Sequence, residues 1–323
     1  MNVRRLISGT AIAAATALGL GALSACSSDS SAADGNGDGK LDVVASFYPM
    51  QYLAEQIGGD RVSVTTLTEP GQEPHDLEIS AKQTVDLQKA DAVLYLKGLQ
   101  PAVDEAVSQS EAKSKIDAAT LTTLEDHGST EHSHDEAEAE EEAHSDEESS
   151  GLDPHVWLDP VKYAEIADGV SAAFQKADPA GAAEYKKNAE ALTAKLTSLD
   201  TSFEDGLKNT ASKVFFTNHA AFGYLAERYG LTQEAIAGVD PESEPSAARM
   251  KELQEEAKAD GVTTVFYETL VSDKTAKTLA EDANLKTDVL DPLEGITEKS
   301  RGDDYIAVME ANLKALQTAL GAK

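Results

Sequence analysis

The 323-residue chain has only one cysteine, few aromatic residues and few basic residues for its number of acids. The single cysteine excludes an intrachain disulfide and any zinc finger built on cysteine pairs. Lys and Arg number 27 against 58 Asp and Glu, which gives a formal net charge of −31. This acidity argues against a nucleic-acid-binding protein, which needs basic side chains to neutralise phosphates, and against attachment to anionic lipid through basic patches. A metal site made of histidines and carboxylates stays open.

Sequence signatures of common catalysts are also missing. The chain contains no HExxH, no GxSxG and no phosphate-binding glycine-rich loop, which argues against the usual metalloprotease, esterase and nucleotide-hydrolysing classes. Its 41% hydrophobic residues are enough to build packed cores. A chain of this length predicts two domains of ordinary size.

The first 25 residues have the layout of a signal peptide. Arg4 and Arg5 precede an uncharged stretch, 6–25, that is rich in Ala, Gly and Leu. The alternative is a transmembrane anchor, since twenty apolar residues are long enough to span a bilayer. The tetrad Leu-Ser-Ala-Cys at 23–26 is similar to a bacterial lipobox, in which Cys26 becomes the lipidated first residue of the mature protein. Residues 26–40 then form a flexible tether.

Short β-type runs alternate with helical patterns from residue 41 onward, which predicts an α/β fold with parallel-rich sheets flanked by helices. The predicted strands are 41–46, 61–67, 91–96, 214–217, 263–267 and 286–290. The predicted helices between them are 50–58, 80–89, 101–110, 160–177, 220–229, 246–260, 273–283 and 303–320.

One segment, 179–208, predicts a single long amphipathic helix of roughly 45 Å. Its apolar residues recur at spacings of seven, four, three and four, and it contains no strand signal. With α/β patterns on both sides, it is expected to be a rigid connection between an N-terminal lobe, 41–178, and a C-terminal lobe, 209–323.

Residues 125–150 interrupt the first lobe with twelve acidic residues, no Lys or Arg and no large apolar residue. Such a composition predicts a disordered loop, because it cannot bury enough surface to offset its ordering entropy. The loop holds four of the chain's seven histidines, and histidine-rich tracts bind metals weakly. We expect accessory metal capture by His127, His132, His134 and His144; the alternative is a plain solvated acidic loop.

The three other histidines each occur in a loop that follows or precedes a predicted element. His75 follows a strand in a turn-rich segment, His155 directly precedes a helix, and His219 lies between a strand and a helix. Open α/β sheets place ligands at the carboxyl ends of their strands, so His75 and His219 fit a site formed by two lobes. Asp291 ends the last predicted strand and is the expected fourth ligand; Glu268, at the end of the preceding strand, competes for that role. Three imidazoles and one carboxylate suit tetrahedral Zn²⁺ better than Mn²⁺, which prefers more oxygen ligands.

At these residues the sequence resembles the zinc/manganese substrate-binding lipoproteins of bacterial ABC importers, specifically the zinc, ZnuA-like branch of the cluster A-I solute-binding proteins. The resemblance covers 41–323 and is carried by Ser-Phe-Tyr-Pro at 46–49, Glu-Pro-His-Asp at 73–76, Asp-Pro-His-Val-Trp-Leu-Asp-Pro at 153–160, His-Ala-Ala-Phe-Gly-Tyr-Leu at 219–225 and Leu-Asp-Pro-Leu at 290–293. It implies two α/β lobes joined by one long helix, with the metal between them. It also implies His75, His155 and His219 as ligands and Asp291 as a provisional fourth, with water or another carboxylate as the alternative.

The resemblance further implies a function and partners. We expect a zinc receptor, held by lipid on Cys26 at the outer face of the cytoplasmic membrane or in a periplasm, that delivers Zn²⁺ to an ABC permease and its ATPase. His219 favours zinc, since manganese members commonly carry Glu at that position. The alternatives are a manganese receptor and a zinc-buffering or adhesin lipoprotein; a zinc hydrolase fits least. We expect a monomer and no enzymatic activity.

Overall fold

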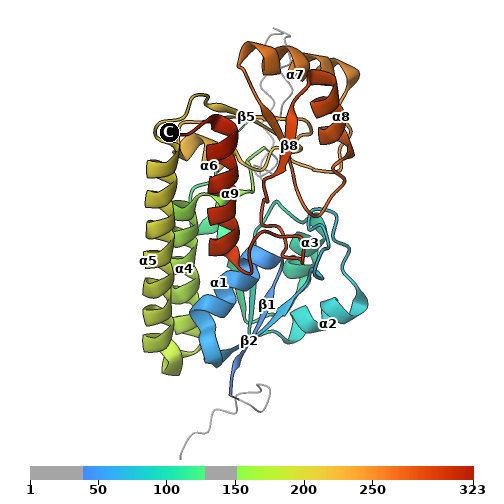
Figure 1. The fold of residues 1–323 in the computed structure, drawn as a ribbon. Coiled ribbons are helices and arrows are strands. Elements are labelled where there is room, and N and C mark those ends of the chain that lie inside the picture. The colour runs from blue at the N-terminus through green and yellow to red at the C-terminus, as the bar shows by residue number, and fades with distance from the viewer. Residues whose placement is uncertain (1–38, 128–150) are drawn as a thin grey trace, which may run out of the picture. The chain divides into compact units, whose positions relative to one another are not determined.

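Two four-stranded parallel sheets carry the fold, one in each half of the chain (Figure 1). The computed structural model describes residues 39–127 and 151–323, which belong to one compact unit. The first sheet has the order β2-β1-β3-β4 and comprises β1 (Leu41–Ala45), β2 (Val62–Thr66), β3 (Ala92–Tyr95) and β4 (Ser114–Asp117). The second has the order β6-β5-β7-β8 and comprises β5 (Val214–Thr217), β6 (Thr232–Ala235), β7 (Thr264–Tyr267) and β8 (Lys286–Val289). We call the first sheet with its helices the N-terminal lobe and the second the C-terminal lobe.

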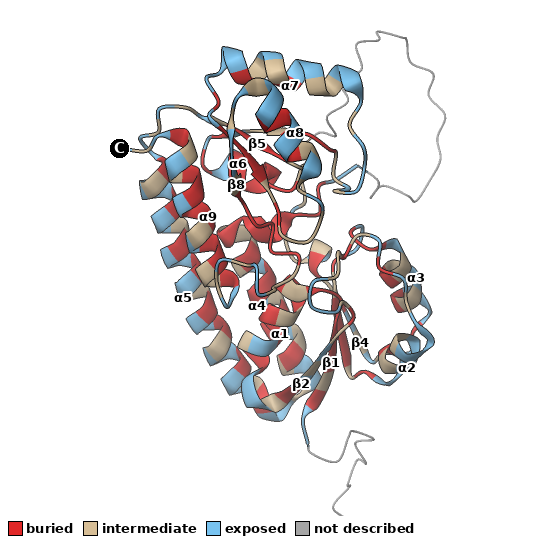
Figure 2. Ribbon diagram, turned by 45° about the vertical axis from the view of Figure 1, so that its right-hand side comes forward, coloured by how far each residue is buried: buried red, intermediate tan, exposed pale blue. Residues whose placement is uncertain are grey.

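Helices cover both faces of each sheet, so the central strands β1, β3, β5 and β7 are buried on both sides, as is usual for parallel sheets (Figure 2). In β1, Val43 packs in the apolar cluster that contains residues of α1 and α4, while Val44 packs in the cluster that contains residues of α2 and α3. The helices of the N-terminal lobe are α1 (Tyr48–Gly58), α2 (Ala81–Lys89), α3 (Pro101–Gln109) and α4 (Pro160–Ala177). Those of the C-terminal lobe are α6 (Gly223–Arg228), α7 (Ala247–Ala259), α8 (Lys274–Ala283) and α9 (Tyr305–Leu320).

The predicted long helix is confirmed as α5 (Ala182–Leu207), whose 26 residues span about 39 Å. A short 3₁₀ turn, Pro179–Gly181, precedes it. Helix α5 lies against α1 and α4 of the N-terminal lobe and against α9 of the C-terminal lobe (Figure 1). Its buried face is one apolar stripe, made of Tyr185, Ala189, Leu192, Leu196, Leu199, Phe203 and Leu207. Because this stripe belongs to a single apolar cluster with residues of both sheets, sliding one lobe past the other would expose part of it.

All six predicted strands are present, but β4 and β6 were not predicted from the sequence. Each of the two is an edge strand with one neighbour, β3 or β5. Their sequences, Ser-Lys-Ile-Asp and Thr-Gln-Glu-Ala, are mostly polar, as edge strands can be. Four residues without an apolar run give no periodicity to detect.

Among the described residues, no helix has both the length and the apolar character needed to cross a bilayer. The predicted signal peptide, Cys26 and residues 27–38 of the tether lie outside the described part of the chain.

Candidate metal centre

His75 lies in the loop that follows β2. The carboxylate of Glu73 shapes this loop, since it accepts hydrogen bonds from the backbone N–H of His75 at 2.9 Å and of Asp76 at 3.2 Å. The imidazole is about nine-tenths buried, with 10% of its side-chain surface exposed. The loop therefore directs the ring inward, while one edge of the ring stays near solvent.

His155 lies at the entry to α4 and is completely buried. The Oδ1 atom of Asp153 accepts hydrogen bonds from both the backbone N–H of His155, at 2.9 Å, and its ring Nδ1, at 2.8 Å. A 3₁₀ turn, Val156–Leu158, follows, and Asp159 then caps α4 by accepting from the backbone N–H of Val161 at 2.8 Å. With Nδ1 bound to a carboxylate, the lone pair of neutral His155 is on Nε2, on the opposite side of the ring.

His219 follows β5 and is held in the same way by the C-terminal lobe. Its Nδ1 lies 2.7 Å from Oε1 of Glu268, the residue directly after β7. Its backbone carbonyl accepts hydrogen bonds from the Thr217 hydroxyl at 2.7 Å and the Gln233 amide at 2.9 Å. Since β5 and β7 are neighbours in the sheet, the ring and its carboxylate partner come from the ends of adjacent strands.

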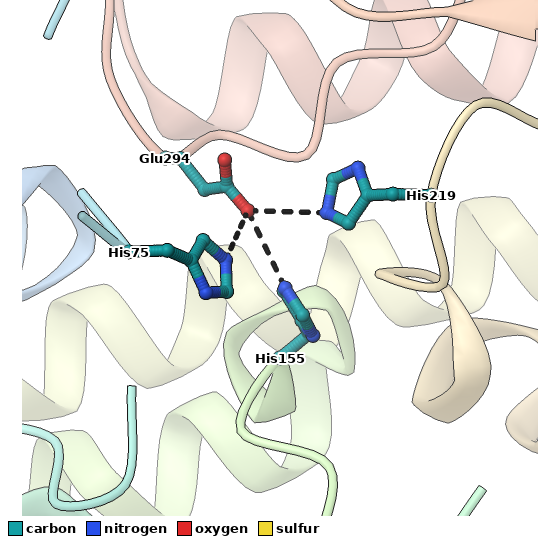
Figure 3. A group of neighbouring side chains, drawn as sticks. All are labelled: His75, His155, His219 and Glu294. Carbon is teal, nitrogen blue, oxygen red and sulfur yellow. Dashed lines mark hydrogen bonds and ion pairs between the residues drawn. The ribbon is translucent and has the colours of Figure 1, made fainter. Parts of the chain in front are cut away.

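The three imidazoles converge on one carboxylate oxygen, Oε1 of Glu294 (Figure 3). The Nε2 atoms of His75, His155 and His219 lie 3.3, 3.4 and 3.4 Å from it, and the four candidate ligand atoms all lie within 4.8 Å of one another. Within the described chain, Nε2 of His155, Nε2 of His219 and Oε2 of Glu294 are buried without a hydrogen bond. Buried polar atoms that lack partners and face one another form a donor set suited to a cation.

Glu294 is carried by the loop between β8 and α9. The Trp157 indole N–H donates to the carbonyl of Pro292 at 2.7 Å, and the Tyr305 hydroxyl donates to the carbonyl of Trp157 at 2.6 Å. Leu293 is fully buried and has a φ of 61°, a left-handed conformation that bulky L-residues rarely adopt. This turn brings Glu294 back toward the three rings.

The charges of this group are strongly coupled. Burial alone would raise the pKa of the Glu294 carboxyl, but the three imidazoles hold it well below its usual range. Burial lowers the pKa of His219, but Glu268 and Glu294 raise it by more, so it lies well above 6.5. The pKa of His155 is likewise raised by Asp153 and Glu294 against the effect of burial. The metal-free group therefore favours protonated His155 and His219 beside an ionised Glu294, and a bound cation would replace those protons.

Asp291 lies outside this group, contrary to the expectation that it supplies the carboxylate. Its Oδ1 accepts from the backbone N–H of Leu293 at 2.9 Å, and its Oδ2 accepts from the Thr269 hydroxyl at 3.4 Å. Its backbone N–H and C=O bind the side-chain amide of Asn312 at 2.9 and 2.7 Å. Burial raises the pKa of Asp291 to about 6. Asp291 thus stabilises the turn that presents Glu294, three residues further on.

The other predicted residues have separate places. Glu268, the predicted competitor of Asp291, contacts Nδ1 of His219 and is a partner of that ring rather than a member of the four. His127 lies at the edge of the described chain, where its Nδ1 is 2.9 Å from Oδ2 of Asp153. His132, His134 and His144 lie outside the described residues. Sequence reasoning missed Glu294, which stands neither at a strand end nor in any of the quoted motifs.

A family model described as zinc-uptake complex component A, periplasmic (ZnuA), matches residues 43–319. The zinc-binding lipoprotein AdcA of Streptococcus pneumoniae R6 is 38% identical over 301 residues, which cover 91% of this chain and 58% of AdcA. The chain thus spans little more than half of that relative. The high-affinity zinc uptake system protein ZnuA of Bacillus subtilis 168 is 37% identical over 303 residues and is covered to 92%, as is this chain.

A solved structure agrees with these sequence matches. The Zn(II)-bound ZnuA-like domain of S. pneumoniae AdcA is 36% identical and superposes with a TM-score of 0.71, over 87% of this chain and 99% of that domain. The likeness extends over both lobes and confirms the α/β, two-lobe fold class predicted from the sequence.

Proposed function

The chain belongs to the ZnuA family of zinc-uptake components, and from this premise we propose that it is an extracytoplasmic receptor that binds Zn²⁺ as cargo for an ABC importer. One observation carries the proposal. Three Nε2 atoms and one carboxylate oxygen converge at a buried point between the lobes, and two of the three rings are fixed through Nδ1 by carboxylates. A histidine whose far nitrogen is bound to a carboxylate is the usual form of a zinc ligand.

We propose His75, His155, His219 and Glu294 as the zinc ligands, with Glu294 in the role that the sequence assigned to Asp291. Three nitrogens and one oxygen suit tetrahedral Zn²⁺, whereas Mn²⁺ favours more oxygen ligands and a higher coordination number. The matches to relatives named for zinc support the same choice of metal. Four protein ligands leave no open position for a catalytic water, which supports a binding role over a hydrolase.

The predicted partners belong to the same proposal. Lipid on Cys26 would hold the receptor at the outer face of the cytoplasmic membrane, or in a periplasm, where it works as a monomer beside its permease and ATPase. Names such as lipoprotein and periplasmic component among the relatives support this location. Lipid on one cysteine anchors a protein without spanning the bilayer.

Growth under zinc limitation tests the importer role. A strain that lacks the protein should grow poorly and take up little ⁶⁵Zn in zinc-depleted medium, and the wild-type chain should restore both. The variant His219→Ala, produced at the same level, should restore neither. Normal growth and uptake in the deletion strain would exclude the importer role and favour a buffering or adhesive lipoprotein.

A further inference from the structure

A second group of ligating side chains lies beside the metal centre, where the chain enters the histidine- and acid-rich segment. It consists of Glu125, His127 and Glu227, whose candidate ligand atoms all lie within 4.8 Å of one another. Nε2 of His127 is 2.9 Å from Oε2 of Glu227. We propose that these three residues form a second, weaker site for a divalent cation, which Zn²⁺ occupies after the buried centre is filled. The proposal deepens the proposed function, on which it rests for the choice of metal.

The strongest support is the way His127 is held. Its Nδ1 lies 2.9 Å from Oδ2 of Asp153, whose other oxygen, Oδ1, binds Nδ1 of His155 at 2.8 Å. One carboxylate therefore orients two imidazoles, one with each oxygen. His127 thus has the carboxylate–histidine arrangement of His155 and His219, with Nε2 directed at the carboxylate of Glu227 and Glu125 nearby.

The ring of His127 is also fixed by close packing on α6. It meets the Tyr224 ring edge to face, with the ring centroids 4.3 Å apart. Gly223 leaves the necessary space, because a Cβ at this position would lie 2.5 Å from Cγ of His127 and 2.8 Å from Oδ2 of Asp153. The Tyr224 hydroxyl accepts from the backbone N–H of Glu125 at 2.8 Å and donates to the carbonyl of Asp153 at 2.7 Å. The position of the His127 ring is therefore fixed by packing within the fold, and its closeness to the acidic residues does not depend on a freely moving side chain.

Charge and exposure explain why this site would be the weaker one. Glu125 already pairs with Nζ of Lys162 at 2.6 Å, so a cation must share that carboxylate with an ammonium. The side chains of His127, Glu125 and Glu227 are 17%, 36% and 61% exposed, whereas His155, His219 and Glu294 are at most 1% exposed. One imidazole and two partly hydrated carboxylates bind Zn²⁺ less tightly than three imidazoles and a buried carboxylate.

A titration of the full chain with Zn²⁺ alone tests the site. The histidines of the undescribed segment are first removed as His132→Gln, His134→Gln and His144→Gln, so that they cannot contribute binding. Calorimetry of this background should show one tight equivalent and one weaker equivalent. Adding Glu227→Gln should weaken the second equivalent by about tenfold or more and leave the first unchanged. The control Glu190→Gln, another exposed glutamate, should change neither.

Nuclear magnetic resonance of the chain labelled with ¹⁵N-histidine provides a second measurement of zinc binding that is independent of calorimetry. The second equivalent should shift the Nε2 signal of His127, while its Nδ1 stays protonated against Asp153. A background variant that binds a single equivalent, or a second equivalent unaffected by Glu227→Gln with no change at His127, would overturn the proposal. Failure of the proposed function appears separately, as the absence of the first, tight equivalent.

Discussion

The two lobes have the same sheet order, yet they supply their ligands in different ways. In the C-terminal lobe, His219 and Glu268 follow the adjacent strands β5 and β7, at the point where the strand order reverses. In the N-terminal lobe the corresponding strands are β1 and β3, and neither is followed by a proposed ligand. Instead, His75 follows the edge strand β2 and His155 lies at the entry to α4.

This difference shows that sheet topology predicts the position of some ligands but not of others. Ligands at the switch point of an open α/β sheet are expected in general, and the C-terminal lobe follows that rule. The N-terminal lobe builds its part from loops, each shaped by a local carboxylate: Glu73 binds the backbone at His75, and Asp153 binds both the backbone and the ring of His155. The sheet therefore sets the position of His219, whereas local carboxylates shape the loops of His75 and His155, and the β8–α9 loop presents Glu294.

The largest effect is expected at the histidine that the sheet positions most firmly. His219→Ala should lower zinc affinity by more than about 100-fold, since partners of ligands alone are worth roughly 10–100-fold. His75→Ala should cost less, because its ring is partly exposed and no described side chain fixes its Nδ1. Calorimetry measures both affinities, and circular dichroism should show that both variants fold. Unchanged affinity in His219→Ala would exclude His219 as a ligand.

Substitutions of Glu294 and Asp291, the two carboxylates of the β8–α9 loop, distinguish a metal ligand from a residue that stabilises the loop. Glu294→Gln should lower zinc affinity by about 100-fold, because among the described residues it removes the one carboxylate that faces all three rings. Asp291→Asn should act chiefly on stability, since its oxygens bind Leu293 and Thr269. Thermal unfolding of the metal-free variants and competition titrations distinguish the two. A larger affinity loss in Asp291→Asn than in Glu294→Gln would restore Asp291 as the fourth ligand.

Substituting the carboxylates that contact Nδ1 of His219 and His155 tests the comparison of the two lobes directly. Glu268→Gln and Asp153→Asn should each weaken zinc binding by about 10–100-fold, because each releases one imidazole from its fixed tautomer. Of these two, only Asp153→Asn should also disturb the second, weaker equivalent, since Asp153 contacts both His155 and His127. If Glu268→Gln reduced the second equivalent as well, the two sites would be linked through something other than Asp153.

Zinc affinity should depend on pH with a defined sign. Because the pKa values of His155 and His219 are raised, zinc binding must displace protons even above pH 6.5. As the pH falls, zinc affinity should therefore fall by about tenfold per pH unit for each proton displaced. For the metal-free fold the sign is opposite: these two groups contribute stability below about pH 6.5 that is lost as the pH rises through their folded pKa values. Calorimetry in buffers of different ionisation enthalpy counts the protons. No proton release at about pH 7 would contradict the raised pKa values.

The smallest effect on the tight site is expected from the acidic segment. Replacing His132, His134 and His144 by Gln should leave the affinity of the first equivalent within about twofold, because the buried centre has a complete ligand set without them. It should reduce the number of weakly bound zinc ions, which mass spectrometry under native conditions measures. An unchanged number would show that this segment is only a solvated linker.

Much of the fold could be predicted from local sequence patterns, whereas the metal centre could be predicted only in part. Most of the predicted strands contain an apolar run, and the long stripe of α5 has strong periodicity, so their positions were predictable. The strands β4 and β6 carry no such signal, because each has only four residues and most of them are polar. The three histidines could be identified because few others occur outside the acidic segment, and each stood in a loop beside a predicted element.

Glu294 could not be predicted, because its position depends on a backbone conformation that no sequence pattern indicates. Asp291 stands where a strand ends, so it is the natural choice from the sequence. In the structure, its carboxylate binds the backbone N–H of Leu293, and Leu293 then adopts a left-handed conformation directly before Glu294. Only glycine favours such a φ, and glycine occurs at 295 and not at 293.

That leucine links the packing of the β8–α9 loop to the position of Glu294. A left-handed conformation costs a residue with a branched side chain on the order of 1–3 kcal/mol, and Leu293 offsets this by filling a fully buried space. Leu293→Gly would relieve the backbone and empty the space, so the loop would gain conformations in which Glu294 no longer faces the rings. The packing of this loop and the retention of the metal therefore depend on the same side chain, and a substitution at position 293 would change both together.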